Sequence, residues 1–271
     1  MKINYVCFFF LLTISNAISQ DFQGVATYKS HRKFDVNVGD ENVNSDMQKQ
    51  IQEQLKKQFQ QEYKLTFNKH ESIYKQEEKL DAPNPSQGGI NIMVAQGLDI
   101  LYKNIKENRF SNKTEIFGKP FLIKDTLVNR KWILENETKN IGNYTCFKAT
   151  YTDEYTMQTI TSQGTFEDQT SQRTTTVWYT PQIPVSTGPE DFHGLPGLIL
   201  EVNDGDMTLV CSKIVINPTE TIEIVEPEKG KVVTQDEYMT IMEEKSKEMM
   251  EQFKSRRGDS DGERTIIRIG G

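Results

Sequence analysis

The segment from Trp178 to Val202 constrains the fold more than any other part of this chain, because it is rich in proline. Four of the nine prolines lie between Pro181 and Pro196. Proline donates no backbone hydrogen bond and fixes φ, so this segment cannot form a central strand of a sheet. Pro196-Gly197 suits the central positions of a type II turn, in which the glycine takes a positive φ. We therefore predict a stiff loop that leads into a buried strand at Leu198–Val202.

Alternation of apolar and polar residues predicts strands over much of the remaining chain. Tyr63, Leu65 and Phe67 alternate with polar residues, as in a strand with one buried face. Asp204-Gly205 lies between two apolar runs and predicts a hairpin whose turn needs positive φ at both central residues. Other short strand-like runs occur at residues 24–28, 72–74, 101–102, 109–110, 116–117, 121–123 and 207–216.

Two segments have the pattern of amphipathic helices. The first begins with a capping box at Ser45 and Gln48, and the second with one at Thr234 and Glu237. We expect both to pack against the sheet; for the first, the alternative is a membrane-surface or partner-binding helix. Its apolar stripe consists of Met47, Ile51, Leu55 and Phe59.

These elements predict an α+β protein in which a curved, half-barrel-like antiparallel sheet packs on amphipathic helices. No internal repeat divides the chain of 271 residues. We therefore expect residues 20–255 to form a single domain. The charged, glycine-containing residues 256–271 are expected to form a mobile tail.

Residues 1–19 have the features of a signal peptide. Lys2 supplies a basic start, residues 5–12 are apolar but too short to span a bilayer, and Ala17 and Ser19 are small at the cleavage-site positions. The alternative is a buried N-terminal helix or strand. We expect a periplasmic or secreted protein, with no transmembrane segment after signal removal and no lipid-anchored cysteine.

Removal of the signal would leave two cysteines, Cys146 and Cys211. An isolated pair in an oxidising compartment is a disulfide candidate. The alternative is two unpaired, buried cysteines that pack as small apolar residues.

The hexapeptide Gly194-Leu195-Pro196-Gly197-Leu198-Ile199, with its prelude Trp178-Tyr179-Thr180-Pro181, resembles the signature of the GLPGLI family of exported proteins of Gram-negative bacteria. Trp132 and Tyr144–Ala149 extend the resemblance upstream, and it weakens over residues 22–125. Family members often carry Gly-Arg where Gln172-Arg173 stands here, after a polar insertion at Thr152–Ser171. The family is of unknown function, so the resemblance implies export and a fold rather than a chemistry.

Composition and motifs exclude several function classes. The formal net charge of −7 repels phosphate backbones, so nucleic acid is not an expected partner. The three histidines, His31, His70 and His193, are scattered without the spacing of a metal site. The sequence contains no phosphate-cradling glycine loop. The methionines of the second helix suit packing better than Cu(I) binding. We expect no metal, no cofactor and no enzymatic activity.

What remains is a binding role. We expect a non-enzymatic binding or carrier module for a lipid or other apolar ligand, or for a cell-envelope protein. The alternative is a structural or interaction protein that docks on an outer-membrane assembly through its proline-rich loop. The candidate ligand- or partner-binding residues are Trp178, Tyr179, Phe192, His193, Leu195 and Pro196.

Overall fold

The computed structural model describes residues 22–32, 60–77, 99–160, 166–220 and 222–256. The predicted signal peptide at 1–19, the predicted helix that begins at Ser45, and nearly all of the predicted tail at 256–271 lie outside the described residues.

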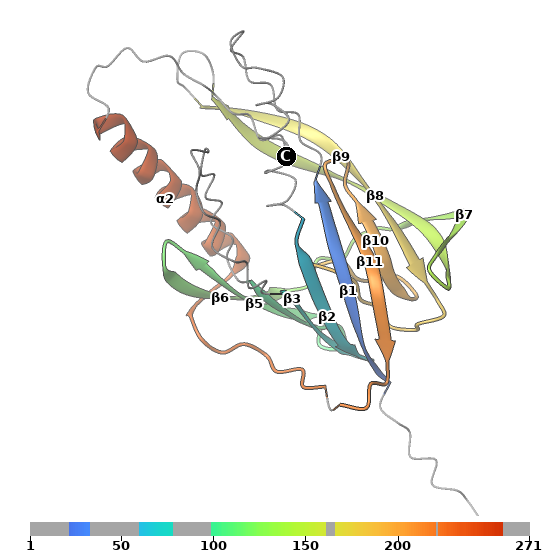
Figure 1. Cartoon of the computed structure of the whole chain (residues 1–271). Coiled ribbons are helices and arrows are strands. Elements are labelled where there is room, and N and C mark those ends of the chain that lie inside the picture. The colour runs from blue at the N-terminus through green and yellow to red at the C-terminus, as the bar shows by residue number, and fades with distance from the viewer. Residues whose placement is uncertain (1–21, 33–59, 78–98, 161–165, 221, 257–271) are drawn as a thin grey trace, which may run out of the picture.

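The described residues form one 12-stranded sheet and one helix (Figure 1). The strand order is β12-β6-β5-β4-β3-β2-β1-β11-β10-β9-β8-β7, and β12 pairs with β6 in parallel while the other pairs are antiparallel. The antiparallel sheet is confirmed. We predicted an α+β protein with a sheet packed on more than one amphipathic helix. The described part of the chain is instead mostly β and contains one helix, α2. The elements are β1 (Gln23–Arg32), β2 (Glu62–Asn68), β3 (Glu71–Gln76), β4 (Ile100–Asn104), β5 (Arg109–Ile116), β6 (Lys119–Thr126), β7 (Ile133–Ile141), β8 (Tyr144–Ile160), β9 (Phe166–Thr180), β10 (Leu198–Asn203), β11 (Met207–Ile216), β12 (Lys231–Val233) and α2 (Gln235–Arg256).

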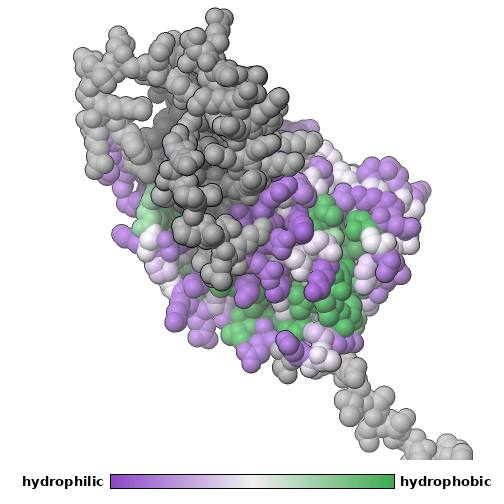
Figure 2. Space-filling model, viewed as in Figure 1, coloured by the Kyte–Doolittle hydropathy of each residue, from purple (hydrophilic) through white to green (hydrophobic). Residues whose placement is uncertain are grey.

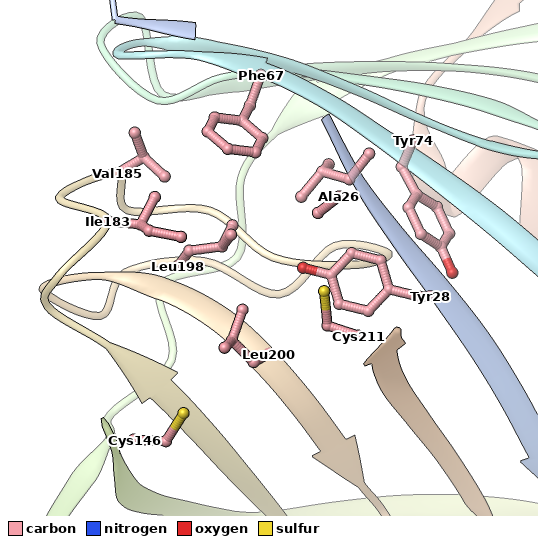
Figure 3. Close-up of a cluster of buried hydrophobic side chains, with 11 residues drawn as sticks. Ala26, Tyr28, Phe67, Tyr74, Cys146, Ile183, Val185, Leu198, Leu200 and Cys211 are labelled. Carbon is pink, nitrogen blue, oxygen red and sulfur yellow. The ribbon is translucent and has the colours of Figure 1, made fainter. Parts of the chain in front are cut away.

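The open sheet curves so that distant strands share one core. Tyr74 on β3 and Cys146 on β8 belong to the same buried cluster, although five strands separate β3 from β8 in the sheet. Figure 3 shows Ile183 and Val185 between Phe67 on one side and the strands that carry Leu198, Leu200 and Cys146 on the other. The loop between β9 and β10 therefore fills the space between the two halves of the sheet.

The polar insertion at Thr152–Ser171 extends the hairpin of β8 and β9. The two strands stay in register from the Phe147–Tyr179 pair to the Ile160–Phe166 pair. In Figure 1 this ribbon runs beyond the strands around it. Threonine is frequent in the insertion and favours strands, and residues 152–160 and 166–171 lengthen the two strands of the hairpin.

The predicted start of the second helix is confirmed. The Thr234 backbone N–H donates to the Glu237 carboxylate at 2.9 Å, and the Glu237 N–H donates to the Thr234 hydroxyl at 3.2 Å. Tyr238 and Ile241 then pack on Phe121 and Val233, which attaches the first turns of α2 to β6 and β12. No helix in the described part of the chain is long and apolar enough to cross a membrane.

The hairpin at Asp204-Gly205 is also confirmed, and it joins β10 to β11. Its turn differs from the predicted one. Gly205 has a φ of 101°, whereas Asp204 is not among the residues with positive φ. The Asp204 carboxylate accepts a hydrogen bond from the Met207 N–H at 2.7 Å, so a side chain helps to close the turn.

Candidate functional site

The segment of residues 181–197, here called the proline loop, occupies the centre of the fold. Its predicted type II turn is wrong, because Gly197 does not have a positive φ. Glycine is required there for space: a Cβ on Gly197 would overlap the carbonyl oxygen of Thr180 and lie 2.8 Å from the nitrogen of Pro181. Gly188 has the same role, since its Cβ would lie 2.7 Å from the Cβ of Ile199. The loop therefore packs directly against the backbone at the end of β9 and against the Ile199 side chain on β10.

A fully buried lysine holds the loop from the opposite half of the sheet. Lys103 on β4 is 0% exposed. Its ammonium donates to the carbonyl oxygens of Gly188 at 2.8 Å, Glu190 at 2.5 Å and Phe192 at 3.1 Å. An ammonium has three N–H donors, so three carbonyl acceptors satisfy its charged form completely.

The surroundings of Lys103 have opposing effects on its pKa. Burial lowers the pKa of Lys103 to about 7; the nearby Asp191 and Glu190 carboxylates raise it, and the Arg130 guanidinium lowers it. Because the ammonium contacts only loop carbonyls, we assign Lys103 a structural role in the loop's conformation.

Arg130 and Trp132, which precede β7, hold the end of the loop. Arg130 forms an ion pair with Asp191, and its Nη1 also donates to the Asp191 carbonyl at 3.0 Å. Its guanidinium lies 4.6 Å from the centre of the Phe192 ring. The indole of Trp132 donates to the His193 carbonyl oxygen at 2.9 Å. These contacts fix residues 191–193 of the loop against the residues that precede β7.

Most of the candidate binding residues predicted from the sequence are buried. Tyr179, Phe192 and Leu195 belong to one core cluster and are 6%, 9% and 2% exposed. Trp178 is partly buried, with the Lys139 ammonium 4.4 Å from its ring centre, and Pro196 is exposed. A role of these residues in binding stays a prediction, but five of the six contribute to the packing of the protein itself.

His193 makes a local contact within the proline loop. It is 8% exposed, and its Nδ1 lies 2.9 Å from the carbonyl oxygen of Asp191. Burial lowers the pKa of His193. Among the described residues, no group of three or more histidine, cysteine or acidic side chains could hold a metal ion.

The predicted Cys146–Cys211 disulfide is not formed in the structure. Both cysteines are free and buried. They belong to one core cluster, but β9 and β10 lie between their strands. Adjacent strands are about 4.8 Å apart, whereas bridged cysteines need Cα atoms within about 7 Å. The unpaired, buried alternative describes the structure.

Tyr74 on β3 and Glu190 in the loop have unusual local surroundings. Tyr74 on β3 is 6% exposed, and its hydroxyl has no hydrogen-bond partner among the described residues. Its ring stacks on Tyr63 at 5.1 Å with an angle of 8°. Glu190 is partly buried and has a φ of 47°, which is unusual for a residue with a side chain. Burial raises the pKa of the Glu190 carboxyl to about 7.

Sequence reasoning missed Lys103, Arg130, Tyr74 and Glu190. Lys103 shares a strand face with Leu101, which was a weak signal of an inward-facing charge. The acceptors of Lys103 are backbone carbonyls of the proline loop, and no side-chain motif marks backbone acceptors. Glu190 stands out through its backbone conformation, which the sequence does not reveal.

Comparison with known proteins gives a partial match. Residues 132–201 match a family model described as a protein of unknown function (Porph_ging). The matched segment includes β7, β8, β9, the proline loop and the start of β10. No curated protein matches the sequence.

Among solved structures, the chain is similar to two crystal forms of PNGF-II. Both share 14% sequence identity with it, with TM-scores of 0.47 and 0.45. The alignments cover 81% and 79% of this chain but only 32% and 31% of that one, so the chain spans about a third of the length of PNGF-II.

Proposed function

We propose that this chain is an exported GLPGLI protein that acts as a non-enzymatic binding module in the cell envelope and holds a protein partner along its edge strand β7. The match to residues 132–201 supports the family, because it contains both the hexapeptide and its upstream segments. The signal-peptide pattern at residues 1–19 supports export to the periplasm or beyond.

The observation that carries the binding role is the exposure of large apolar side chains on β7. This strand ends the sheet order, and its Ile133 and Leu134 are 63% and 59% exposed. An edge strand has unpaired backbone donors and acceptors on its outer side, which an extended segment of another protein can pair. On the neighbouring strand β8, Phe147 is 37% exposed.

The charges of β7 do not oppose such pairing, because each of them has a partner within the sheet. Glu135 and Glu137 contact the Lys148 ammonium on β8 at 3.0 and 2.9 Å. Lys139 contacts Glu201 on β10 at 2.7 Å. Paired charges weaken the usual protection of an edge strand against association.

A protein partner is better supported than a lipid or other apolar ligand inside the sheet. The proline loop fills the space between the two halves of the sheet, with Ile183 and Val185 at its centre (Figure 3). The view in Figure 2 includes apolar surface over the central strands, interspersed with hydrophilic side chains. The burial of Phe192, His193 and Leu195 likewise argues against docking through the loop itself, the alternative from the sequence.

Site-specific photocrosslinking tests this function. A photoreactive amino acid replaces Leu134 on β7 or, as a control, Val232 on β12 at the other end of the sheet, which is 61% exposed. We expect one adduct of discrete mass in the cell envelope from position 134 and none from position 232. Adducts of equal yield at both positions, or none at either, would contradict the proposal. If Pro196→Ala abolishes partner binding and Leu134→Asp does not, the proline loop is the docking surface.

A further inference from the structure

Unsatisfied polar atoms gather over one face of the long hairpin that β8 and β9 form. Among the residues that the structure describes, five buried side-chain atoms have no hydrogen-bond partner, and three of them lie here. They are Nε of Arg130, Nε of Arg173 and Oδ1 of Asp153. A buried polar atom without a partner costs free energy, so several in one place point to a bound molecule that supplies the missing partners.

Two tyrosines of β8 connect these side chains. Tyr151, Asp153 and Tyr155 alternate along the strand and therefore point to the same face of the sheet. The Arg130 guanidinium lies 5.6 Å from the centre of the Tyr151 ring, and the Arg173 guanidinium lies 5.3 Å from the centre of the Tyr155 ring. Asp153 is the partner of Arg173 across the hairpin. These five residues, here called the hairpin face, place one carboxylate between two arginine–tyrosine pairs.

The ion pair between Arg173 and Asp153 is only half formed. Nε and Nη2 of a guanidinium lie on one edge, where a carboxylate can accept two parallel hydrogen bonds. Here Nη2 lies 3.4 Å from Oδ2 of Asp153, while Nε and Oδ1 have no partner among the described residues. A hydroxyl group satisfies both atoms at once, because it accepts one hydrogen bond and donates another. A simple anion has no proton to donate to Oδ1, and an ammonium cannot accept from Nε.

The charge of the hairpin face and its surroundings also favours a neutral ligand. Arg130 forms an ion pair with Asp191, and Arg173 lies 3.4 Å from Asp153 and 3.7 Å from Asp204. Three carboxylates thus surround two guanidinium groups, which leaves no excess positive charge to attract phosphate or sulfate. Solvent reaches the pair at the centre, because the side chains of Arg173 and Asp153 are 40% and 25% exposed.

Aromatic rings flank these polar groups, as in sites that bind sugars. Tyr151 and Tyr155 are half-buried, and Trp132 meets the Tyr151 ring edge to face at 5.7 Å. The C–H groups of a sugar ring pack on aromatic faces, while its hydroxyls bond to arginine and carboxylate groups. Four residues of a strand span about 13 Å, so the two tyrosines are farther apart than the length of one sugar ring.

We propose that the hairpin face binds a neutral oligosaccharide. One sugar hydroxyl accepts from Nε of Arg173 and donates to Oδ1 of Asp153, a second accepts from Nε of Arg130, and the sugar rings lie on Tyr151 and Tyr155. Asp153 and Tyr155 belong to the polar insertion, which partner binding along β7 leaves without a role. The sugar contacts side chains on a face of the sheet, whereas the partner of β7 pairs with the outer edge of that strand, so either function can fail without the other.

Calorimetric titration of the full chain with maltotriose, cellotriose, mannotriose and chitotriose tests this site, with inorganic phosphate as the charged comparison probe. At least one trisaccharide should bind saturably, and phosphate should not bind. Asp153→Ala and Arg173→Met should each weaken binding of that trisaccharide at least about tenfold, because each removes a charge-assisted hydrogen bond. Glu154→Ala, which removes an exposed carboxylate from the opposite face of β8, is the matched control and should leave the affinity unchanged.

Tyr155 separates ring packing from hydrogen bonding. Tyr155→Ala should weaken binding several-fold, whereas Tyr155→Phe keeps the ring and most of the affinity. Circular dichroism confirms that each variant is folded. The proposal is overturned if no trisaccharide binds the wild type saturably, if phosphate binds in place of the sugars, or if Asp153→Ala binds as tightly as the wild type.

Discussion

The ammonium nitrogen of Lys103 lies 2.8 Å from the carbonyl oxygen of Gly188, although 85 residues separate them in the chain. The contact joins β4, in one half of the curved sheet, to the loop that leads into β10, in the other half. Gly188 is itself fixed against Ile199 on β10. One buried charge therefore couples the curvature of the sheet to the conformation of the proline loop.

Replacement of Lys103 by methionine tests this coupling. Lys103→Met keeps much of the side-chain volume but leaves the three loop carbonyls without a donor. We expect a loss of about 3–5 kcal/mol in the free energy of unfolding, measured by urea denaturation. The control Lys106→Met changes an exposed lysine next to β4 and should stay within about 0.5 kcal/mol. A loss below about 1 kcal/mol for Lys103→Met would show that the contact is dispensable.

The sequence predicted the parts of this fold that depend on local chemistry. The capping box at Thr234 and Glu237 and the hairpin at Asp204-Gly205 are short-range patterns, and both are confirmed. The position of the proline loop was not predictable, because it depends on contacts across the curved sheet. Lys103 and Glu190 were not predicted either. The partners of Lys103 are backbone carbonyls, which no sequence motif marks, and Glu190 is distinguished by its φ of 47°, which the sequence does not reveal.

The close approach at Gly197 leads to a second prediction. A Cβ there would overlap the backbone of Thr180, and backbone cannot move aside as a flexible side chain can. We expect Gly197→Ala to lower the free energy of unfolding by more than about 3 kcal/mol or to prevent folding. Gly142→Ala is the matched control: Gly142 has a φ of 57° with no atom within 4 Å of the added Cβ, so the cost should be about 1 kcal/mol. Equal losses in thermal or urea denaturation would refute the steric explanation.

Two buried tyrosines should respond to phenylalanine in opposite ways. The Tyr28 hydroxyl donates to the Ile199 carbonyl oxygen at 2.7 Å, whereas the Tyr74 hydroxyl has no partner in the part of the chain that the structure describes. Tyr28→Phe should destabilise the protein by about 1–2 kcal/mol. Tyr74→Phe should be neutral or stabilising, because it removes an unsatisfied buried group. A destabilisation of Tyr74→Phe as large as that of Tyr28→Phe would show that the Tyr74 hydroxyl has a partner in the free protein.

The two cysteines should remain reduced in the folded protein. Burial raises the pKa of Cys146 to about 11 and that of Cys211 to about 12, so the reactive thiolate is scarce at pH 8. We expect both thiols to react with a colorimetric disulfide reagent only after unfolding in urea, even when the protein is purified from an oxidising compartment. Mass spectrometry of the native protein should show the mass of two free thiols; a mass lower by two hydrogens would establish the bridge instead.

Glu190 should make stability depend on pH near neutrality. Burial raises its folded pKa to about 7, above the ordinary value of 4.5 that it regains on unfolding. Between these values the folded protein binds a proton that the unfolded chain does not, so the contribution of Glu190 to stability falls as pH rises from about 4.5 to about 7. Glu190→Gln should therefore be more stable than the wild type at pH 8, by an amount on the order of 1–3 kcal/mol, and the gain should be much smaller at pH 5. Urea denaturation at the two pH values measures the difference, with the exposed Glu115→Gln as the control, expected to change stability by less than about 0.5 kcal/mol at either pH. A gain of equal size at both pH values would mean that the ionised carboxylate is not what the folded protein disfavours.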